Sequence, residues 1–399
     1  METEVVDRET IKTVPYLRFK EFQKLWKKYK LEDFCNFFSG GTPSSTNKSY
    51  YSGTIPFIGS GNIFDNKVSS FITEEALQSS SAKMVNEGDL LYALYGANSG
   101  EVAVSKMKGA INQAILCIRS EENIYFIYSL LSLNQKKIIT KYLQGGQGNL
   151  SARIIKNLKF HVPSLPEQQK IASFLSAVDN KIQQFTRKKD LLETYKKGVM
   201  QKLFSQEIRF KDEEGKEYSE WEEKRFDKLF KFKQGLQFPV EEQSEAPFKD
   251  SISFIRIINV TSDPNDSRFV KNPGKEYHLT SKDLFMVRYG DAGRIAMGFE
   301  GVIANNMFNL IPIQNLHRKF YYYLIEFNYK KLHNLAGSST MPALNFTSLG
   351  SFKLLVPQKE EQQKIAEFLS AIDRKLEAVS QQIGRTQAFK KGLLQQMFV

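Results

Sequence analysis

Cysteine is scarce in this sequence, with only Cys35 and Cys117 among 399 residues. The two lie in different surroundings, without a CxxC motif or a Cys/His cluster, so we interpret them as buried thiols rather than a disulfide or a metal site. Free thiols are typical of the cytoplasm. Long hydrophobic runs are also missing, and the first ten residues match neither a signal peptide nor a transit peptide. We therefore expect a cytoplasmic protein with no bound metal and no membrane partner.

Motifs for catalysis and nucleotide binding are missing as well. The sequence has no GxxxxGK[ST] loop that could cradle a phosphate, and no Asn/Asp-Pro-Pro-Tyr/Phe motif of adenine methyltransferases. Its four histidines are scattered without metal-ligand spacing. The Gly-rich segments 96–100 and 289–293 are interpreted as tight turns between strands. We find no candidate catalytic residue and expect no cofactor bound by this chain.

Positive charge is abundant. The formal net charge is +12 and the pI is about 9.3, while 41% of the residues are hydrophobic, as in a folded globular protein. A chain of 399 residues is long enough for two or three domains, each with its own core. Because nucleic acid is the commonest polyanion that a folded basic surface binds, the charge favours DNA or RNA as a partner.

One segment occurs twice, at residues 162–204 and 356–398, with a constant offset of 194 and 19 identities in 43 positions. Apolar residues in each copy recur in steps of four and three, which predicts a long helix with a coiled-coil seam. Lys189, Lys196, Thr386 and Lys390 interrupt the seams. The predicted seam residues are Ile171, Leu175, Val178, Ile182, Phe185, Leu192, Val199, Leu203, Ile365, Leu369, Ile372, Leu376, Val379, Ile383, Leu393 and Met397.

The duplication extends beyond these helices. Residues 17–20 (LRFK) and Trp26 reappear as residues 208–211 (IRFK) and Trp221, and each copy is followed by short strand-like runs with Gly, Ser and Asn turns. The expected fold class is α+β: two mixed α/β modules separated by two long antiparallel coiled-coil helices in a pseudo-twofold repeat. We expect a flexible tail over residues 1–14, a first module over 15–163, a first helix over 164–206, a second module over 207–357 and a second helix over 358–399.

The order of these parts predicts how the helices pair. The second module begins directly after the first helix, so the second helix must run back towards the first module. About 40 residues at about 1.5 Å each span at most about 60 Å, and one DNA turn is about 34 Å. The pair can therefore hold two modules about one turn apart. By the same pseudo-symmetry, residues 17–20 should pack beyond the end of the second helix, near Val399.

Polar and Gly-rich loops recur at equivalent places in both modules and are the candidate DNA contacts. Asn and Gln pair with adenine and Arg with guanine in the major groove, and Gly permits close backbone approach. The candidates in the first module are Gly41, Thr42, Ser44, Ser45, Ser60, Asn62, Asn98, Gln147, Asn149 and Arg153. Those in the second are Gln234, Gln237, Arg256, Asn259, Arg288, Arg294, Asn305 and Asn306.

Nearly the whole chain resembles the specificity (S) subunits of type I restriction–modification systems. The residues that carry the resemblance are 39–44 (SGGTPS), 55–58 (IPFI), 166–172 (PEQQKIA), 361–369 (EQQKIAEFL) and 345–349 (NFTSL) before Val356 and Pro357. The resemblance implies two target-recognition domains that each read half of a bipartite double-stranded DNA site. It also implies two modification subunits, which use S-adenosylmethionine, and two restriction subunits, which use ATP and Mg.

The hypothesis is therefore a non-catalytic DNA-recognition subunit. Two alternatives stay open at this point. One is a stand-alone DNA methyltransferase or nuclease fragment, which would modify or cut DNA without partners. The other is a coiled-coil scaffold without a DNA role, which would fail to shift target DNA even with modification subunits present.

Overall fold

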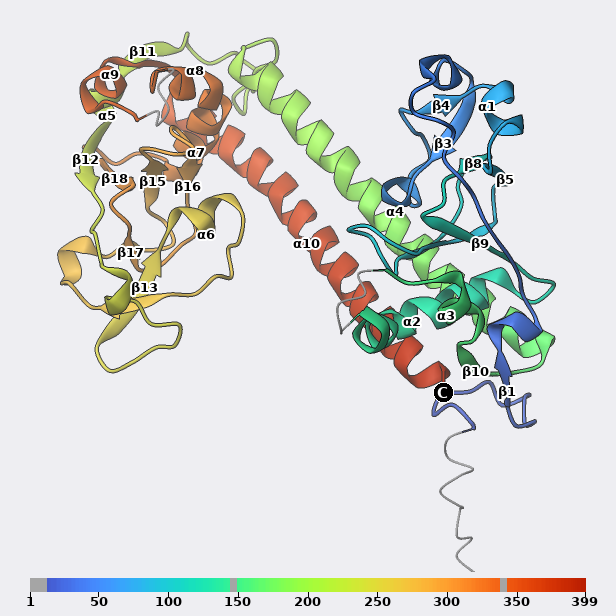
Figure 1. Cartoon of the computed structure of the whole chain (residues 1–399). Coiled ribbons are helices and arrows are strands. Elements are labelled where there is room, and N and C mark those ends of the chain that lie inside the picture. Colours follow the sequence, from blue (N-terminus) through green and yellow to red (C-terminus); the bar gives the residue numbers. More distant parts are fainter. Residues whose placement is uncertain (1–12, 144–148, 338–342) are drawn as a thin grey trace, which may run out of the picture. The chain divides into compact units, whose positions relative to one another are not determined.

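The structure is a computed structural model that describes residues 13–143, 149–337 and 343–399 (Figure 1). The chain forms two compact units, one of Met1–Thr186 with Gln381–Val399 and one of Arg187–Ser380. The two longest helices, α4 (Leu165–Phe204) and α10 (Lys359–Met397), each contribute to both units. In the described part of the chain, no helix is long and apolar enough to cross a membrane.

Unit 1 contains two four-stranded sheets and a two-stranded ribbon. The sheet orders are β2-β9-β6-β7 and β4-β3-β8-β5, and β1 pairs with β10. All pairings are antiparallel except the one between β3 and β8. The strands are β1 (Lys27–Lys30), β2 (Asn36–Ser39), β3 (Ile55–Ile58), β4 (Phe71–Ile72), β5 (Lys83–Val85), β6 (Leu90–Ala93), β7 (Val102–Val104), β8 (Gly109–Ile111), β9 (Ile115–Arg119) and β10 (Lys159–Val162). The helices are α1 (Glu74–Gln78), α2 (Ile124–Leu143) and α3 (Ala152–Lys156).

Unit 2 repeats this plan with one strand fewer in its second sheet. Its sheet orders are β12-β18-β15-β16 and β14-β13-β17, β11 pairs with β19, and β13 and β17 form the parallel pair. The strands are β11 (Glu222–Arg225), β12 (Phe230–Gln234), β13 (Ser251–Ile255), β14 (Phe269–Lys271), β15 (Leu284–Val287), β16 (Ile295–Ala296), β17 (Val302–Ile303), β18 (Met307–Pro312) and β19 (Lys353–Val356). The helices are α5 (Phe226–Leu229), α6 (Ile257–Thr261), α7 (Arg318–Phe327), α8 (Tyr329–Asn334) and α9 (Phe346–Ser351). The expected α+β fold class, with duplicated mixed modules and a helix pair, is confirmed.

Two glycines explain how each module joins its sheets. Gly40 follows β2, and a Cβ there would lie 1.8 Å from the carbonyl oxygen of Ile111 at the end of β8. Gly235 follows β12, and its Cβ would lie 2.3 Å from the Ala304 oxygen just after β17. Only glycine permits this close backbone approach. The retained glycine therefore brings the end of one sheet against the parallel strand pair of the other.

The long helices run antiparallel within each unit. In unit 1, Ile171 and Leu175 of α4 lie in one apolar cluster with Leu393 and Met397 of α10. In unit 2, Leu203 of α4 shares a cluster with α10 residues 365, 369 and 372. The seam residues Ile171, Leu175, Leu203, Ile365, Leu369, Ile372, Val379, Leu393 and Met397 are buried, and Val178, Ile182, Phe185, Leu192, Val199, Leu376 and Ile383 are half-buried.

Two of the lysines that interrupt the seams pair with a carboxylate of the other long helix. Lys390 lies 2.6 Å from an Asp179 oxygen in unit 1. Its counterpart Lys196 lies 2.9 Å from Asp373 in unit 2. The two lysines are 194 positions apart, and so are the two aspartates, which is the offset of the repeat. The duplication therefore preserved the ion pair. Each replaces an apolar layer by a charge pair that only one antiparallel register satisfies.

The segment before each module is attached by a buried acid that the helix pattern does not predict. Glu167, in the first turn of α4, is 1% exposed. Its carboxylate accepts two hydrogen bonds from Arg18, at 2.7 and 2.8 Å, and one from Trp26 at 3.1 Å. Glu361 in unit 2 accepts equivalent bonds from Arg209 and Trp221, at 2.7 to 3.1 Å.

The predicted position of residues 17–20 is confirmed. The Leu17 N–H donates to the carbonyl oxygen of Gln396 at 2.8 Å, just as the Ile208 N–H donates to Lys202 at 3.2 Å after α4. Trp26 packs edge-on against Phe398 with ring centroids 6.4 Å apart. The start of module 1 therefore covers the end of α10 within unit 1.

Candidate nucleic-acid interface

Four loops of module 1 converge at one edge, which we call reading edge 1 and define as residues 40–46, 59–62, 95–100 and 112–114. The Asn98 side chain donates to the Ser60 carbonyl oxygen at 3.2 Å, which joins two of the loops. The Thr42 hydroxyl donates to the side-chain oxygen of Gln113, and the Tyr95 hydroxyl donates to the Gln113 carbonyl oxygen. Gln113 thus ties the third and fourth loops to the first.

Module 2 has the equivalent reading edge 2, formed by residues 235–243, 256–259, 288–294 and 304–306. The Asn305 amide donates to the Gln237 side-chain oxygen at 3.0 Å. The Tyr289 hydroxyl donates to the Asn305 carbonyl oxygen at 2.9 Å. The loops therefore converge as they do in module 1.

The two edges share a frame but not its polar side chains. Thr42 and Gln237 each stand two residues after the glycine that joins the sheets, and Gln113 and Asn305 each stand two residues after the parallel strand pair. The tyrosine-to-carbonyl bond is the same in both modules, whereas the pair Thr42–Gln113 becomes Gln237–Asn305. Equivalent backbone positions thus present different hydrogen-bonding groups.

Most module 1 candidates lie on reading edge 1 or beside it. Thr42, Ser44 and Ser45 are exposed, and Ser60, Asn62 and Asn98 are half-buried. Asn149 is exposed next to Leu150, whose N–H donates to Leu94 beside the third loop. Arg153 is exposed on α3 outside the four loops, and Gln147 lies outside the described residues.

Two candidates lie in the interior of their modules. A Cβ on Gly41 would lie 2.6 Å from the Ser81 side chain, and Gly41 itself is buried. Asn259 is 7% exposed, and its side chain accepts from the Arg256 N–H at 2.8 Å and donates to the Asp266 carbonyl at 2.8 Å. Glycine at 41 serves packing, and Asn259 closes its own turn. Gly41 has no side chain to present, and the Asn259 side chain is engaged by its own turn.

Arginines of module 2 are held by neighbours. Arg288 donates to the Gln234 side-chain oxygen at 2.9 Å, and its guanidinium lies 4.6 Å from the centre of the Phe346 ring. Arg256 pairs with Asp266 through one terminal nitrogen. Its Nε atom is shielded from solvent and has no hydrogen-bond partner in the described part of the chain. Arg256 therefore keeps one unused donor.

A shallow concavity brings together Gln237, Arg256, Asn305 and Asn306. The Oδ1 atom of Asn306 is also shielded and has no hydrogen-bond partner among the described residues. Both unpaired atoms are shielded from solvent, so a base edge could not contact them directly, whereas Gln237 and Asn305 line the same concavity with an amide pair. Amide groups such as these two are part of the chemistry that recognises base edges.

Arg294 lies apart from this group. It pairs with Asp291 and lines a different concavity together with Asn259, Tyr322 and Tyr329. Burial alone would raise the pKa of Asp291, but hydrogen bonds from Tyr329 and Arg294 outweigh it and lower that pKa. Arg294 is therefore neutralised by a firmly ionised neighbour, which weakens its assignment as a base contact.

Gln113 is the edge residue that the sequence reasoning missed. It is exposed and is the hub of reading edge 1. The sequence contained a signal for Gln113, because its counterpart Asn305 was a candidate. Each of the two residues follows the second strand of the parallel pair, β8 in module 1 and β17 in module 2. Among the described residues, no group of His, Cys, Asp and Glu could hold a metal ion.

Both thiols are free and buried, as predicted. Burial raises the pKa of Cys35 and of Cys117 to about 12. Neither thiolate is therefore available near neutral pH, which fits a structural role in the core of module 1.

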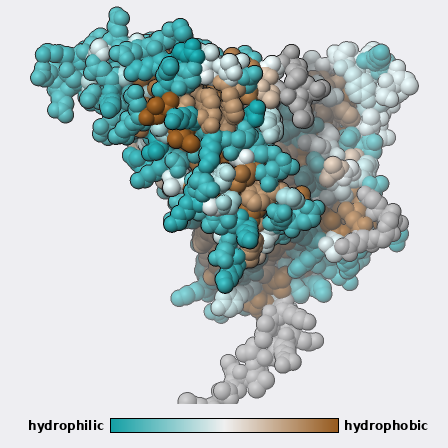
Figure 2. Space-filling view, turned by 90° about the vertical axis from the view of Figure 1, so that its left-hand side faces the viewer, coloured by the Kyte–Doolittle hydropathy of each residue, from teal (hydrophilic) through white to brown (hydrophobic). Residues whose placement is uncertain are grey.

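Figure 2 shows a predominantly hydrophilic face on which hydrophobic residues gather in small patches.

Comparison with known proteins extends over both modules. The family model of the type I restriction modification DNA specificity domain matches residues 23–194 and again residues 218–384. The specificity subunit of type I restriction enzyme MjaVIII from Methanocaldococcus jannaschii is 26% identical over 408 residues, which cover 94% of each chain.

Solved structures show the same fold. The type I restriction-modification S subunit from M. genitalium has a TM-score of 0.64 at 18% identity, and the match covers 97% of this chain and 99% of that one. A chain from a structural study of complex assembly and conformational transition of the type I R-M system has a TM-score of 0.55 at 15% identity, with 92% and 96% covered.

Proposed function

The chain belongs to the family of type I restriction–modification DNA specificity subunits, and from that premise we propose that each module reads one half of a bipartite, asymmetric DNA target. Module 1 corresponds to residues 15–163 and module 2 to residues 207–357. The helix pair formed by α4 and α10 sets the spacing between half-sites. The chain itself carries recognition and no catalysis.

One observation supports this division above all. Both modules keep the order of the first, four-stranded sheet, the same sheet-joining glycine and the same tyrosine-to-carbonyl bond, yet Thr42–Gln113 is replaced by Gln237–Asn305. A shared frame with different polar groups is what two readers of different sequences require. A scaffold without a DNA role has no need for such divergence at one edge.

The chemistry of reading edge 2 fits duplex DNA. Gln237 and Asn305 offer amide groups in a concavity that Arg256 and Asn306 also line. Amides pair best with adenine and guanidinium with guanine in the major groove. Exposed lysines around the modules contact phosphates without reading sequence, in line with the net charge of +12.

The partners follow from this assignment. Two modification subunits dock on the helix pair and use S-adenosylmethionine to methylate an adenine that they flip out of the duplex. Two restriction subunits, which use ATP and Mg, complete the full enzyme. The complex acts on double-stranded DNA in the cytoplasm, where buried free thiols such as Cys35 stay reduced.

The experiment is a module exchange. Residues 16–160 are replaced by the corresponding segment of another specificity subunit, and adenine methylation is mapped across the genome of a strain that carries the modification subunit. We expect one half of the methylated target to change while the other half and the spacing stay the same. A methylation pattern in which both halves changed would contradict the proposal.

A further inference from the structure

A pair of exposed lysines occurs at the same place in both modules. Lys136 and Lys137 lie on α2, and Lys330 and Lys331 lie on α8. The offset between the two pairs is 194, as it is between the long helices. All four side chains are exposed, and none has a hydrogen-bond, ion-pair or aromatic partner in the described part of the chain. We call these four residues the paired lysines.

Packing explains every other residue that the surrounding helical segments have in common. Residues 124–143 of module 1 and 318–337 of module 2 are identical at 6 of 20 positions. The four identities besides the lysines are buried or half-buried: Phe126 and Phe320, Tyr128 and Tyr322, Leu130 and Leu324, and Asn134 and Asn328. Both asparagine side chains donate to the carbonyl oxygen four residues earlier, at 2.9 and 2.8 Å. The fold gives no comparable reason to keep two exposed charges, which favours a partner that both modules bind.

The helices that carry the paired lysines support the third loop of each reading edge. A Cβ on Gly100 would lie 2.7 Å from the Ile139 side chain and 3.8 Å from that of Gln135. A Cβ on Gly293 in module 2 would lie 3.1 Å from the Cβ of Leu332. The residues that flank the paired lysines therefore face the loop, while the lysines themselves face solvent. A duplex bound at a reading edge thus adjoins the helix that presents these charges.

The positive charge of the paired lysines is not neutralised on their own helices. α2 contains no Asp or Glu, and Glu326, the single acid of residues 318–337, is half-buried. A lysine ammonium is a compact charge on a flexible stem, which suits phosphate oxygens without requiring a fixed angle. Adjacent residues of a helix point about 100° apart, so the two ammonium groups spread rather than converge on one carboxylate. A regular row of phosphates therefore fits each pair better than a single acidic side chain does.

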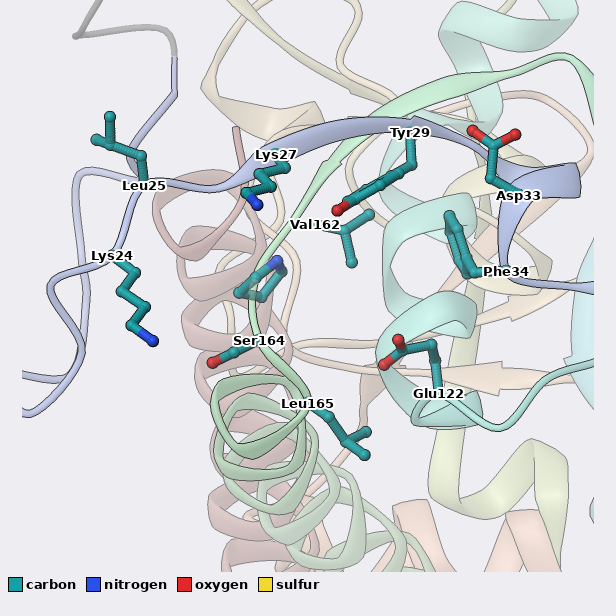
Figure 3. Close-up of a pocket in the computed structure, with 11 residues that line it drawn as sticks. Lys24, Leu25, Lys27, Tyr29, Asp33, Phe34, Glu122, Val162, Ser164 and Leu165 are labelled. Atoms are coloured by element: carbon teal, nitrogen blue, oxygen red, sulfur yellow. The ribbon is translucent and has the colours of Figure 1, made fainter.

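Another pair of exposed lysines, Lys27 and Lys28 on β1, was not kept by the duplication. Their counterparts on β11 are Glu222 and Glu223, which occupy the same register against the partner strand. In Figure 3, Lys27 lines a groove that the carboxylate of Glu122 also lines. Basic charge on this ribbon is thus reversed in module 2 and has an acid nearby in module 1. These two lysines therefore provide a control with the same number of charges.

We propose that the paired lysines of each module bind phosphates of the half-site that this module reads, whatever its base sequence. This inference rests on the proposed function, because it takes DNA as the ligand of both modules. It adds a sequence-independent grip to each module. It also explains why the two charges were kept while the reading edge beside them changed its polar groups.

The test measures how strongly DNA binding depends on salt. The full-length chain, in complex with the modification subunits of its own system, is titrated against a fluorescent duplex that contains the target found by methylome mapping. A second duplex of equal length lacks the target, and fluorescence anisotropy gives both association constants at several KCl concentrations. The variants K136Q/K137Q and K330Q/K331Q each remove two charges and keep side-chain length and helix propensity. K27Q/K28Q removes two exposed charges as the control.

We expect the slope of log association constant against log salt concentration to become less negative by about 2 in either paired-lysine variant, because each phosphate contact contributes about 0.9. The affinity for both duplexes should fall by the same factor, about tenfold or more at low salt, so discrimination between them stays as in the wild type. A variant that combines all four substitutions should change the slope by about 4. K27Q/K28Q should leave the slope unchanged.

Three outcomes would overturn the inference. Slopes that change no more in the paired-lysine variants than in K27Q/K28Q would show that these lysines bind no phosphates. A greater loss of affinity for the target duplex than for the other duplex would make them readers of bases. Loss of modification subunits from the complex, detected by native mass spectrometry, would assign the lysines to an acidic protein surface. A wild-type complex that does not prefer the target duplex would instead overturn the proposed function, which the module exchange tests separately.

Discussion

The helix starts and the reading edges of the two units have diverged to very different degrees. At the start of each long helix, Glu167 and Glu361 accept the same bonds from an arginine and a tryptophan. At each reading edge, the backbone frame is the same but Thr42–Gln113 has become Gln237–Asn305. The interior that holds a module on its helix is thus constrained by burial and ion pairing, while the edge is free to change with the target.

The largest effect should come from removing the buried carboxylates. In E167A or E361A, a half-buried arginine and a buried tryptophan N–H lose their partner, which costs about 3 to 5 kcal/mol of unfolding free energy. Because the two clusters have the same contacts, we expect the two losses to agree within about 1 kcal/mol. Hydrogen exchange followed by mass spectrometry would report each unit separately.

The matched controls are E32A and E223A, which remove exposed carboxylates whose ion pairs are worth little. Stability unchanged in E361A, with a large loss in E167A, would show that the two clusters are not equivalent.

A smaller and more local effect is expected at the reading edges. Q237A and N305A should relax recognition in the half-site of module 2 only, and Q113A in that of module 1 only. Each lost base contact should reduce discrimination by about 1 to 3 kcal/mol. The readout is methylation of oligonucleotide duplexes that carry single changes in either half-site, with N149A as a comparison beside reading edge 1. One substitution that relaxed recognition of both half-sites would contradict the proposal that each module reads only its own half-site.

The smallest effect concerns a carboxylate that only unit 2 has. The Oε2 atom of Glu326, on α7, lies 3.7 Å from the Lys196 Nζ atom. It has no hydrogen-bond partner in the described part of the chain. The corresponding residue of unit 1 is Ser132, which has no carboxylate. Burial is the main cause that raises the pKa of Glu326; Lys196 opposes it, and the negative charge of Asp373 adds to it.

The pH dependence follows from that direction. A folded-state pKa above the unfolded value means that the folded state binds more protons between the two values, so this group lowers stability as pH rises through that window. We expect E326Q to remove this loss and to stabilise unit 2 slightly at neutral pH. Denaturation of the wild type and of E326Q at acidic and at neutral pH would check this prediction. A gain in unfolding free energy from E326Q that is larger at acidic than at neutral pH would contradict it.

The repeat in the sequence was sufficient to predict much of the fold. Seam spacing predicted the two long helices, and the position of the second module after Phe204 predicted that they run antiparallel. The same pseudo-symmetry predicted where Leu17 lies, which its bond to Gln396 confirms. These predictions rest on local periodicity and on chain order, which the sequence contains directly.

The rest depended on contacts between distant residues. Gly41 looked available in a Gly-rich loop, but Ser81 packs against it. Asn259 looked like a reader of bases, but the backbone of Asp266 uses its amide. The Arg18–Glu167–Trp26 cluster was missed because it joins residues about 140 to 150 positions apart, although Arg, Trp and Glu recur together in the second copy.

The central claim is that each module reads its own half-site within an interchangeable frame. A direct measurement is the methylome of a strain whose specificity subunit carries residues 16–160 a second time in place of residues 207–354. The account predicts a symmetric target in which the half-site of module 1 occurs twice in inverted orientation. Methylation that still occurs at the original asymmetric target would contradict it.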